Sequence, residues 1–145
     1  MRVTMMLADH AQVADGKLFI AGGGLSMAGP GPTPCALALL FHIPWQRAGE
    51  RVDFTLNLID EDGHPVIQGG GPEGPGPVRV SGHFETKIPP ETPPGDEITV
   101  PVAFGSMLHL PPGRRYTWLL EVDGEGEDTW RLSFATRQDK ATATG

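Results

Sequence analysis

The sequence predicts an all-β protein, a single-domain antiparallel β-sandwich of about eight strands with an immunoglobulin-like or jelly-roll-like arrangement. Three observations favour this fold class: apolar and polar residues alternate along many short segments, helix-period patterns are almost absent, and 20 glycines and 15 prolines separate the segments. The chain has 145 residues, the size of one domain. We expect residues 1–137 to form the sandwich and 138–145 to form a flexible tail.

The expected strands follow from alternation, because successive side chains of a strand point to opposite faces of its sheet. The clearest is RVDFTLNLID at 51–60, whose apolar residues fall on every second position. Pro101 has no N–H group for a ladder, so its strand, EITVPVAF at 97–104, is expected at a sheet edge. The other expected strands are RVTMMLA (2–8), KLFIAGGG (17–24), ALALLFHIP (36–44), VRVSGHFET (78–86), RYTWLLEVDG (115–124) and TWRLSFAT (129–136).

Turn residues separate these segments. Asp-Gly pairs at 15–16, 62–63 and 123–124 can adopt the positive φ angles of tight hairpins. The longer connections are too rich in proline for a helix or a central strand. These connections are residues 28–34, 68–77 and 88–96.

The stretch LADHAQVADGKLFIAGGG, residues 7–24, contains two aspartates and a histidine and raises the question of a metal site. We expect a connection instead, with Asp9 ending the first strand and Asp15 in the closing turn. A zinc site needs three or four protein ligands, and no neighbouring residue completes a set of Asp9, His10 and Asp15. The glycines at 22–24 then indicate a bulge or a close approach of two backbones.

No other motif has the spacing of a catalytic or cofactor site. The glycines at 69, 71 and 74 match GxGxxG, but the prolines around them leave no helix to bind a phosphate. The single cysteine, Cys35, excludes an internal disulfide and is expected to pack as a small hydrophobic residue, not to act as a nucleophile. We therefore expect no catalytic residue, no cofactor, no metal ligand and no enzymatic activity.

The charge of the chain limits its partners. A net charge of −7 disfavours nucleic acids and anionic membranes, since both are bound largely through basic residues. The longest apolar run, residues 35–44, is too short for a membrane-spanning helix, and the N-terminus is a poor signal peptide. We expect a cytoplasmic protein.

Trp45, Gln46 and Arg47 follow a strand end and form the candidate interaction surface, because exposed tryptophan is common where proteins meet. We expect a non-catalytic protein-binding or self-associating module, whose partner is another protein or a second copy joined through an edge strand. Two alternatives stay open. One is a small-molecule or carbohydrate-binding sandwich with Trp45 or Trp118 as a stacking platform, and the other is a metal-dependent enzyme built on His10, His42 and nearby acids.

The segments LADHAQVADGKLFIAGGG (7–24) and LPPGRRYTWLLEVDGEGEDTWRLSFAT (110–136) resemble an uncharacterised bacterial family, found mostly in actinobacteria. Members of that family open with an Ala-Asp or Cys-Asp pair that ends the first strand, and they close with a hairpin around an Asp-Gly turn. The resemblance extends over nearly the whole chain. It implies a single-domain β-sandwich of unknown function and brings no catalytic residue with it.

Overall fold

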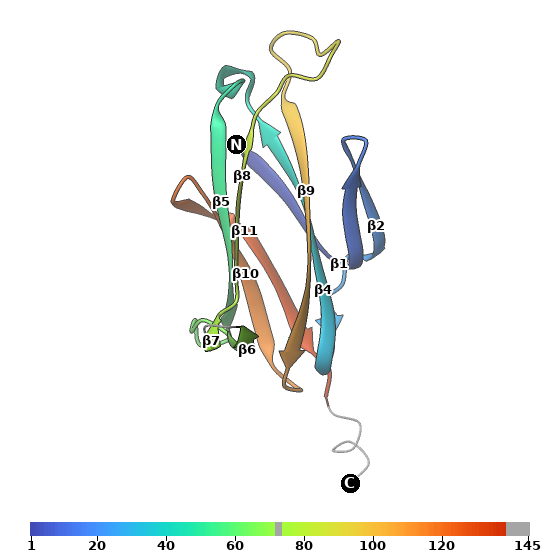
Figure 1. Cartoon of the computed structure of the whole chain (residues 1–145), viewed down its shortest axis with the longest axis vertical. Helices are drawn as coiled ribbons and strands as arrows, with labels where there is room; N and C mark the ends of the chain where they lie inside the picture. The colour runs from blue at the N-terminus through green and yellow to red at the C-terminus, as the bar shows by residue number, and fades with distance from the viewer. Residues whose placement is uncertain (72–73, 139–145) are drawn as a thin grey trace.

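The computed structural model describes residues 1–71 and 74–138, and within them the protein is all-β apart from one short 3-10 helix (Figure 1). These described residues form eleven strands in three sheets. The eight expected segments all form strands, and the three additional short strands lie in or beside connections for which we expected neither a helix nor a central strand. The expected tail at 138–145 lies, from residue 139 onward, outside the described residues.

Two larger sheets and one small hairpin make up the architecture. The four-stranded sheet has the order β2-β1-β4-β9 and contains β1 (Arg2–Ala14), β2 (Lys17–Gly23), β4 (Gly31–Ile43) and β9 (Ile98–Leu110). The five-stranded sheet has the order β3-β11-β10-β5-β8 and contains β3 (Met27–Ala28), β11 (Glu125–Thr136), β10 (Arg115–Val122), β5 (Arg51–Asp60) and β8 (Arg79–Glu85). The hairpin pairs β6 (Ile67–Gly71) with β7 (Gly74–Pro77).

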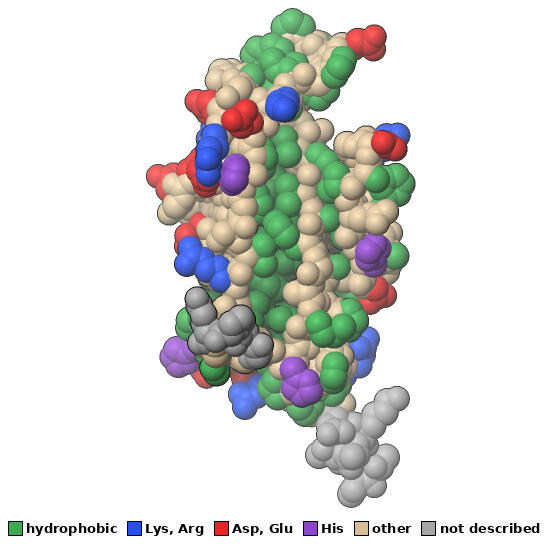
Figure 2. All heavy atoms as spheres, in the orientation of Figure 1, with side chains coloured by type: hydrophobic (Ala, Val, Ile, Leu, Met, Phe, Trp, Pro, Cys, Tyr) green, Lys and Arg blue, Asp and Glu red, His purple; other side chains and the backbone are tan. Residues whose placement is uncertain are grey.

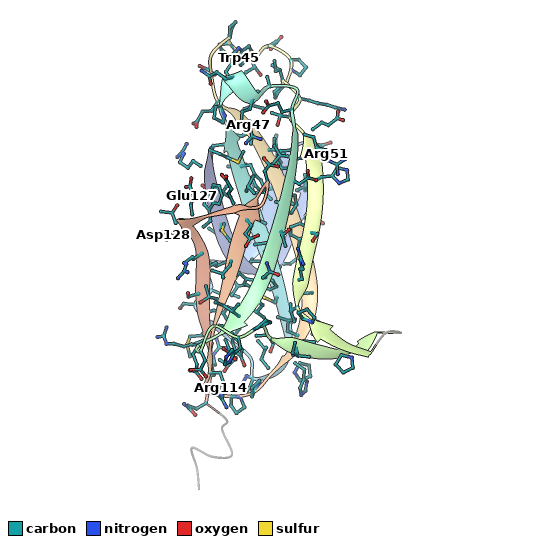
Figure 3. The ribbon with its side chains drawn as sticks, turned by 90° about the vertical axis from the view of Figure 1, so that its left-hand side faces the viewer. Trp45, Arg47, Arg51, Arg114, Glu127 and Asp128 are labelled. Atoms are coloured by element: carbon teal, nitrogen blue, oxygen red, sulfur yellow. The ribbon has the colours of Figure 1, made fainter. Side chains whose placement is uncertain are left out.

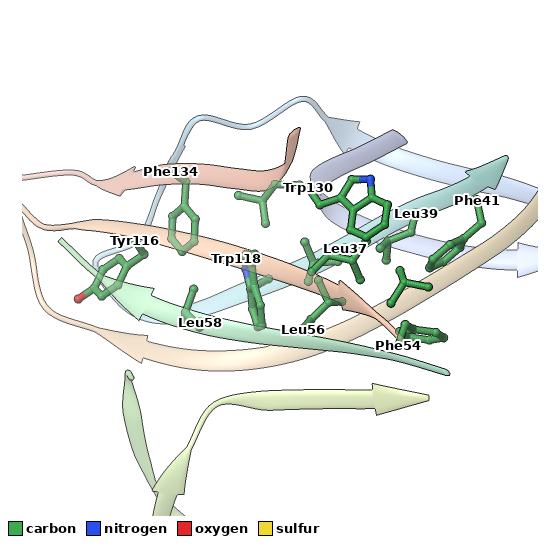
Figure 4. Packing of buried hydrophobic residues seen from close by; sticks show 14 of the residues in the cluster. Leu37, Leu39, Phe41, Phe54, Leu56, Leu58, Tyr116, Trp118, Trp130 and Phe134 are labelled. Carbon is green, nitrogen blue, oxygen red and sulfur yellow. The ribbon is translucent and has the colours of Figure 1, made fainter. Parts of the chain in front are cut away.

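One hydrophobic core lies between the two larger sheets (Figure 4). Alternate residues of a strand point to the same face of its sheet, so the apolar residues at these positions meet in the core. Leu37, Leu39 and Phe41 of β4 belong to the same buried cluster as Leu56 of β5. Trp118 of β10 has no exposed surface and lies among them. The alternative in which Trp118 stacks against a sugar or metabolite is therefore wrong.

The sequence predicted that the first strand ends at Asp9, but β1 continues to Ala14. Its first half, from Arg2 to Ala8, pairs with β4, whereas beyond Asp9 it pairs only with β2. The alternation breaks at Asp9 because the strand loses one neighbour there. The predicted connection over residues 9–16 is thus reduced to the turn at Asp15 and Gly16, whose φ angles are positive, 52° and 69°.

The β1–β2 hairpin folds toward the outer face of its own sheet. Ala11 and Leu18 of the hairpin pack with Ala36 and Ala38 on the outer side of β4, and β2 contacts β9, so the sheet is strongly curled. The glycines at 22–24 provide the predicted close approach, since a Cβ atom at Gly22 would collide with the Asp9 carboxylate.

The prediction that residues 28–34 contain no central strand is wrong, because Pro32 and Pro34 lie within β4. Strand β1 pairs with β4 only from Ala36 onward, so both prolines stand where β4 has no neighbour on that side and no N–H is needed. The expected edge position of Pro101 is confirmed, because β9 is the last strand of the four-stranded sheet.

Candidate functional site

Strand β9 pairs on one side only, with β4, in an unbroken antiparallel register from Ile98↔Ile43 to Leu110↔Gly31. The Gln68 side chain shows which residues turn their backbone groups outward. Its Nε2 donates to the carbonyl oxygen of His109 at 3.1 Å, and the His109 N–H donates to its Oε1 at 3.0 Å. Since every second residue of a strand points its backbone groups the same way, the outward set continues through Thr99, Pro101, Ala103, Gly105 and Met107.

No strand of the described residues pairs with these outward groups. The strand also lacks the usual protection of a sheet edge. No charged residue occurs between Ile98 and Leu108, the strand is 13 residues long, and Pro101 is its only proline. Met107, on the outer face, is 67% exposed. Strand β9 therefore offers an accessible row of backbone hydrogen-bonding groups in an uncharged setting.

Strand β8 is the corresponding edge of the five-stranded sheet, and it is protected. The Asp53 carbonyl accepts a hydrogen bond from the Asp123 N–H, so the backbone groups of Asp53 and of every second residue of β5 face β10. The backbone groups of the residues between them, such as Phe54, therefore face β8. The outward residues of β8 are then Arg79, Ser81, His83 and Glu85, which are all exposed and include one cationic and one anionic side chain. Charged side chains of this kind oppose pairing with another strand.

Half-buried hydrophobic side chains fill the space between the two edges and form what we call the apolar strip. Figure 2 shows it as a column of hydrophobic atoms between the backbones of β8 and β9. The strip consists of Val80 and Phe84 from β8 and Val100, Val102 and Phe104 from β9.

Aromatic contacts fix the floor of the apolar strip. The ring centroid of Phe54 lies 6.2 Å from that of Phe84 and 5.7 Å from that of Phe104, and Phe41 lies 5.1 Å from Phe84. Ring centroids at 4.5–7 Å are typical of favourable aromatic pairs. The two edges are thus held by one packed cluster, which provides a rigid base for a bound segment.

Trp45, Gln46 and Arg47 form the 3-10 helix that follows β4, at the opposite end of the molecule from Arg114 (Figure 3). Trp45 is half-buried and packs against the core, and Gln46 beside it is exposed. Arg47 is held by ion pairs of 2.8 Å to Glu50 and to Asp123, and these hydrogen bonds raise the pKa of its guanidinium. The interaction surface at these three residues stays a prediction.

The residues of the metal alternative do not come together. Among the described residues, the close groups of acids and histidines include neither Asp9 nor His10. His42 accepts or donates a hydrogen bond with Thr4 at 3.1 Å and lies 3.4 Å from the Arg2 guanidinium, a cationic neighbour that opposes a bound cation.

Asp60, Asp62 and His64 do gather in the turn after β5. The Asp60 carboxylate accepts hydrogen bonds of 2.9 Å from the N–H groups of His64 and Asp62. The hydrogen bond from the His64 N–H has the largest effect and lowers the pKa of Asp60, and the hydrogen bond from the Asp62 N–H lowers it further. These hydrogen bonds close the turn and explain why the three side chains lie close together. The group was not predicted from the sequence, although the alternating spacing of its three residues is a signal for it.

Comparison with known protein families identifies the family of this chain. Residues 3–135 match the "Family of unknown function (DUF6941)". The chain belongs to this family. The match extends from β1 to β11 and therefore includes both edges of the apolar strip. No curated protein and no solved structure matches the chain.

The surface of this DUF6941 family member has shallow hollows near both ends of the two larger sheets. One of 240 Å³ is lined by Arg47, Asp123, Glu127 and Trp130, and another of 380 Å³ by Gln68, His109, Arg114 and Tyr116. Both are open and rich in polar groups, whereas small-molecule sites are concave and mostly apolar.

The thiol of Cys35 lies in the core of the domain, where burial raises its pKa. A raised pKa disfavours the thiolate that a nucleophile requires. Within the part of the chain that the structure describes, no helix is long and apolar enough to cross a membrane.

Proposed function

We propose that this protein is a non-catalytic protein-binding module that takes up an extended segment of its partner as an additional strand beside β9. The observation that carries the proposal is the combination of an unpaired, uncharged edge strand with the apolar strip next to it. In strand addition, backbone hydrogen bonds provide affinity and side-chain contacts provide specificity. Strand β9 supplies the backbone groups, and the strip supplies the apolar contacts.

The shape of the expected ligand follows from the same residues. A strand that pairs with β9 places every second side chain over the apolar strip, so these positions should be apolar. The neighbouring strand β8 presents both Arg79 and Glu85, so no single charge sign is favoured at the border of the strip. The two large sheets that share one core support a β-sandwich as the scaffold, and its immunoglobulin-like or jelly-roll-like character belongs to the proposal.

The location belongs to the proposal as well. Cys35 is a buried free thiol and the protein has no second cysteine, a composition that suits a reducing compartment. The net charge of −7 supports a protein partner over nucleic acid or an anionic membrane.

A peptide-display selection against the purified protein tests the proposal, with Gly105→Pro as the diagnostic variant. Gly105 is an outward residue of β9, and a Cβ atom there meets nothing within 4 Å, so the substitution removes one outward N–H group with little effect on packing. The matched control is Ser81→Pro, which places the same ring at an outward position of β8. Circular dichroism and urea unfolding verify that both variants fold.

The expected result is enrichment of uncharged peptides with alternating apolar residues. Fluorescence polarisation should show that Gly105→Pro weakens their binding by about tenfold or more and that Ser81→Pro leaves it unchanged. The proposal is wrong if no such peptides are enriched, or if the two proline variants bind them equally well.

A further inference from the structure

Resting on the proposed function, we infer that the segment taken up by β9 is the β9 strand of a second copy, paired antiparallel about a two-fold axis at Ala103. The first argument is charge. Each copy carries a net charge of −7, so two copies repel one another over most of their surfaces. The segment from Ile98 to Leu108 carries no charge, which permits two identical chains to meet there.

The second argument is the pattern of backbone donors. Pairing centred on Ala103 brings Ala103 opposite itself, Pro101 opposite Gly105, and Thr99 opposite Met107. Pro101 lacks an N–H group, so the two Pro101–Gly105 pairs form one hydrogen bond each and the other three pairs form two each, roughly eight in all. Every outward N–H group of this segment then has an acceptor.

Axes at the two neighbouring outward residues, Gly105 and Pro101, are less favourable. An axis at Gly105 brings Pro101 opposite His109, whose backbone groups already bond with Gln68. An axis at Pro101 places two residues without N–H groups opposite each other. The Gln68 contact agrees with the axis at Ala103, because Ile98 of one copy then pairs with Leu108 of the other and His109 is left to Gln68.

The third argument is the apolar strip. On the inner face, the same register brings Val102 of each copy opposite Phe104 of the other. A β-branched residue beside an aromatic residue is a favourable pair across two strands. Both side chains are half-buried in the single chain and become covered in the pair. On the outer face, the bare Cα of Gly105 leaves space for the ring of Pro101.

Cysteine cross-linking tests this register. In a hydrogen-bonded antiparallel pair the two Cα atoms are about 5.5 Å apart, within the range of about 4.4–6.8 Å that a disulfide spans. Ala103→Cys should therefore form a disulfide-linked dimer under mild oxidation. Thr99→Cys and Met107→Cys should each stay uncross-linked, because identical residues there are eight positions apart along the pair, about 27 Å. An equimolar mixture of these two variants should cross-link.

Wild-type protein is the control for Cys35, which is buried and should not cross-link. Light scattering after size exclusion, from about 1 to 100 μM, should show a dimer that forms with concentration, and Gly105→Pro should shift its dissociation constant upward by about tenfold or more. Ser81→Pro should leave that constant unchanged.

The possible outcomes separate this inference from the proposed function. A strict monomer throughout the range overturns the second copy, and the proposed function then stands if display peptides still bind in a manner sensitive to Gly105→Pro. A dimer that cross-links at Met107→Cys alone, or fails to cross-link at Ala103→Cys, overturns the register. A dimer with the predicted cross-links supports both.

Discussion

Replacement of Gly82 by alanine should destabilise the protein, because the ring of Phe54 occupies the space above this glycine. A Cβ atom at position 82 would lie 2.6 Å from Cζ of Phe54 and 3.2 and 3.3 Å from its two Cε atoms. Carbon atoms in contact are normally about 3.5–4.0 Å apart. The ring cannot move freely, since it packs against Phe41 at 5.4 Å and Phe104 at 5.7 Å.

The expected loss in the free energy of unfolding follows from two opposing effects. Forcing extra atoms into a packed core costs about 1–3 kcal/mol. The change from glycine to alanine also restricts the unfolded chain, which returns about 0.4–1 kcal/mol. We therefore expect a net loss of about 1–2 kcal/mol, or a decrease in Tm of about 2–8 °C for a domain of this size.

Urea unfolding followed by tryptophan fluorescence measures this loss, since Trp118 is fully buried. Gly126→Ala is the matched control, because a Cβ atom at this strand position meets its nearest neighbours at 3.7 and 3.9 Å, which are ordinary contacts. In a double-mutant cycle, Phe54→Leu should remove most of the cost of Gly82→Ala. Equal stability of the two glycine variants, or an additive cycle, would refute the reasoning.

Three further predictions concern the acid response, the thiol and a turn. The Asp123 carboxylate accepts hydrogen bonds from the Asp53 N–H at 3.0 Å and from Arg47 at 2.8 Å, and both lower its pKa, the first more than the second. The stability that these bonds provide is complete above the unfolded pKa of about 3.9 and is lost as pH falls through the lower folded pKa. The urea midpoints of wild type and Asp123→Asn should therefore differ at pH 7 and converge toward pH 2, and a difference that stays constant with pH would contradict this. Cys35 should react with a thiol-specific disulfide reagent only as fast as the protein unfolds, and immediate reaction of the folded protein would contradict its burial. Gly16→Ala should cost about 1–2 kcal/mol in urea unfolding, because Gly16 has a φ of 69°, and a variant as stable as wild type would show that the turn tolerates a side chain.

Alternation predicted the core well because burial on one face of a strand selects every second residue. The inner positions of β5 and β10, including Leu56 and Trp118, are buried as the pattern requires. Positive φ angles at both residues confirm the Asp-Gly turns at 15–16 and 123–124, whereas in the pair at 62–63 only Gly63 has a positive φ. These features depend on local geometry, which the sequence encodes directly.

The errors arose where a strand changes its neighbours. Asp9 interrupts the alternation without ending β1, and Pro34 lies inside β4, because in both places one side of the strand has no partner. A sequence pattern reports whether a residue tolerates exposure or lacks an N–H group. It does not report which strand lies beside it, and that arrangement depends on contacts between distant segments.

The candidate site could be predicted only in part for the same reason. Pro101 indicated an edge strand, but the apolar strip exists because β8 and β9 happen to be the adjacent edges of two different sheets. Trp45, which the sequence predicts as a contact residue, has a half-buried side chain that packs against the core. Its position just past a strand end was correct, and its exposure depended on packing that the local sequence does not specify.

The protection of the other edges limits how large an assembly can become. Once two β9 strands have joined, the free edges of the two larger sheets in each copy are β3, which has two residues, β2, which has seven, and β8, which carries Arg79, His83 and Glu85. None of these edges approaches the 13 residues of β9. Growth should therefore stop at a closed pair with two-fold symmetry and should not continue into a fibre.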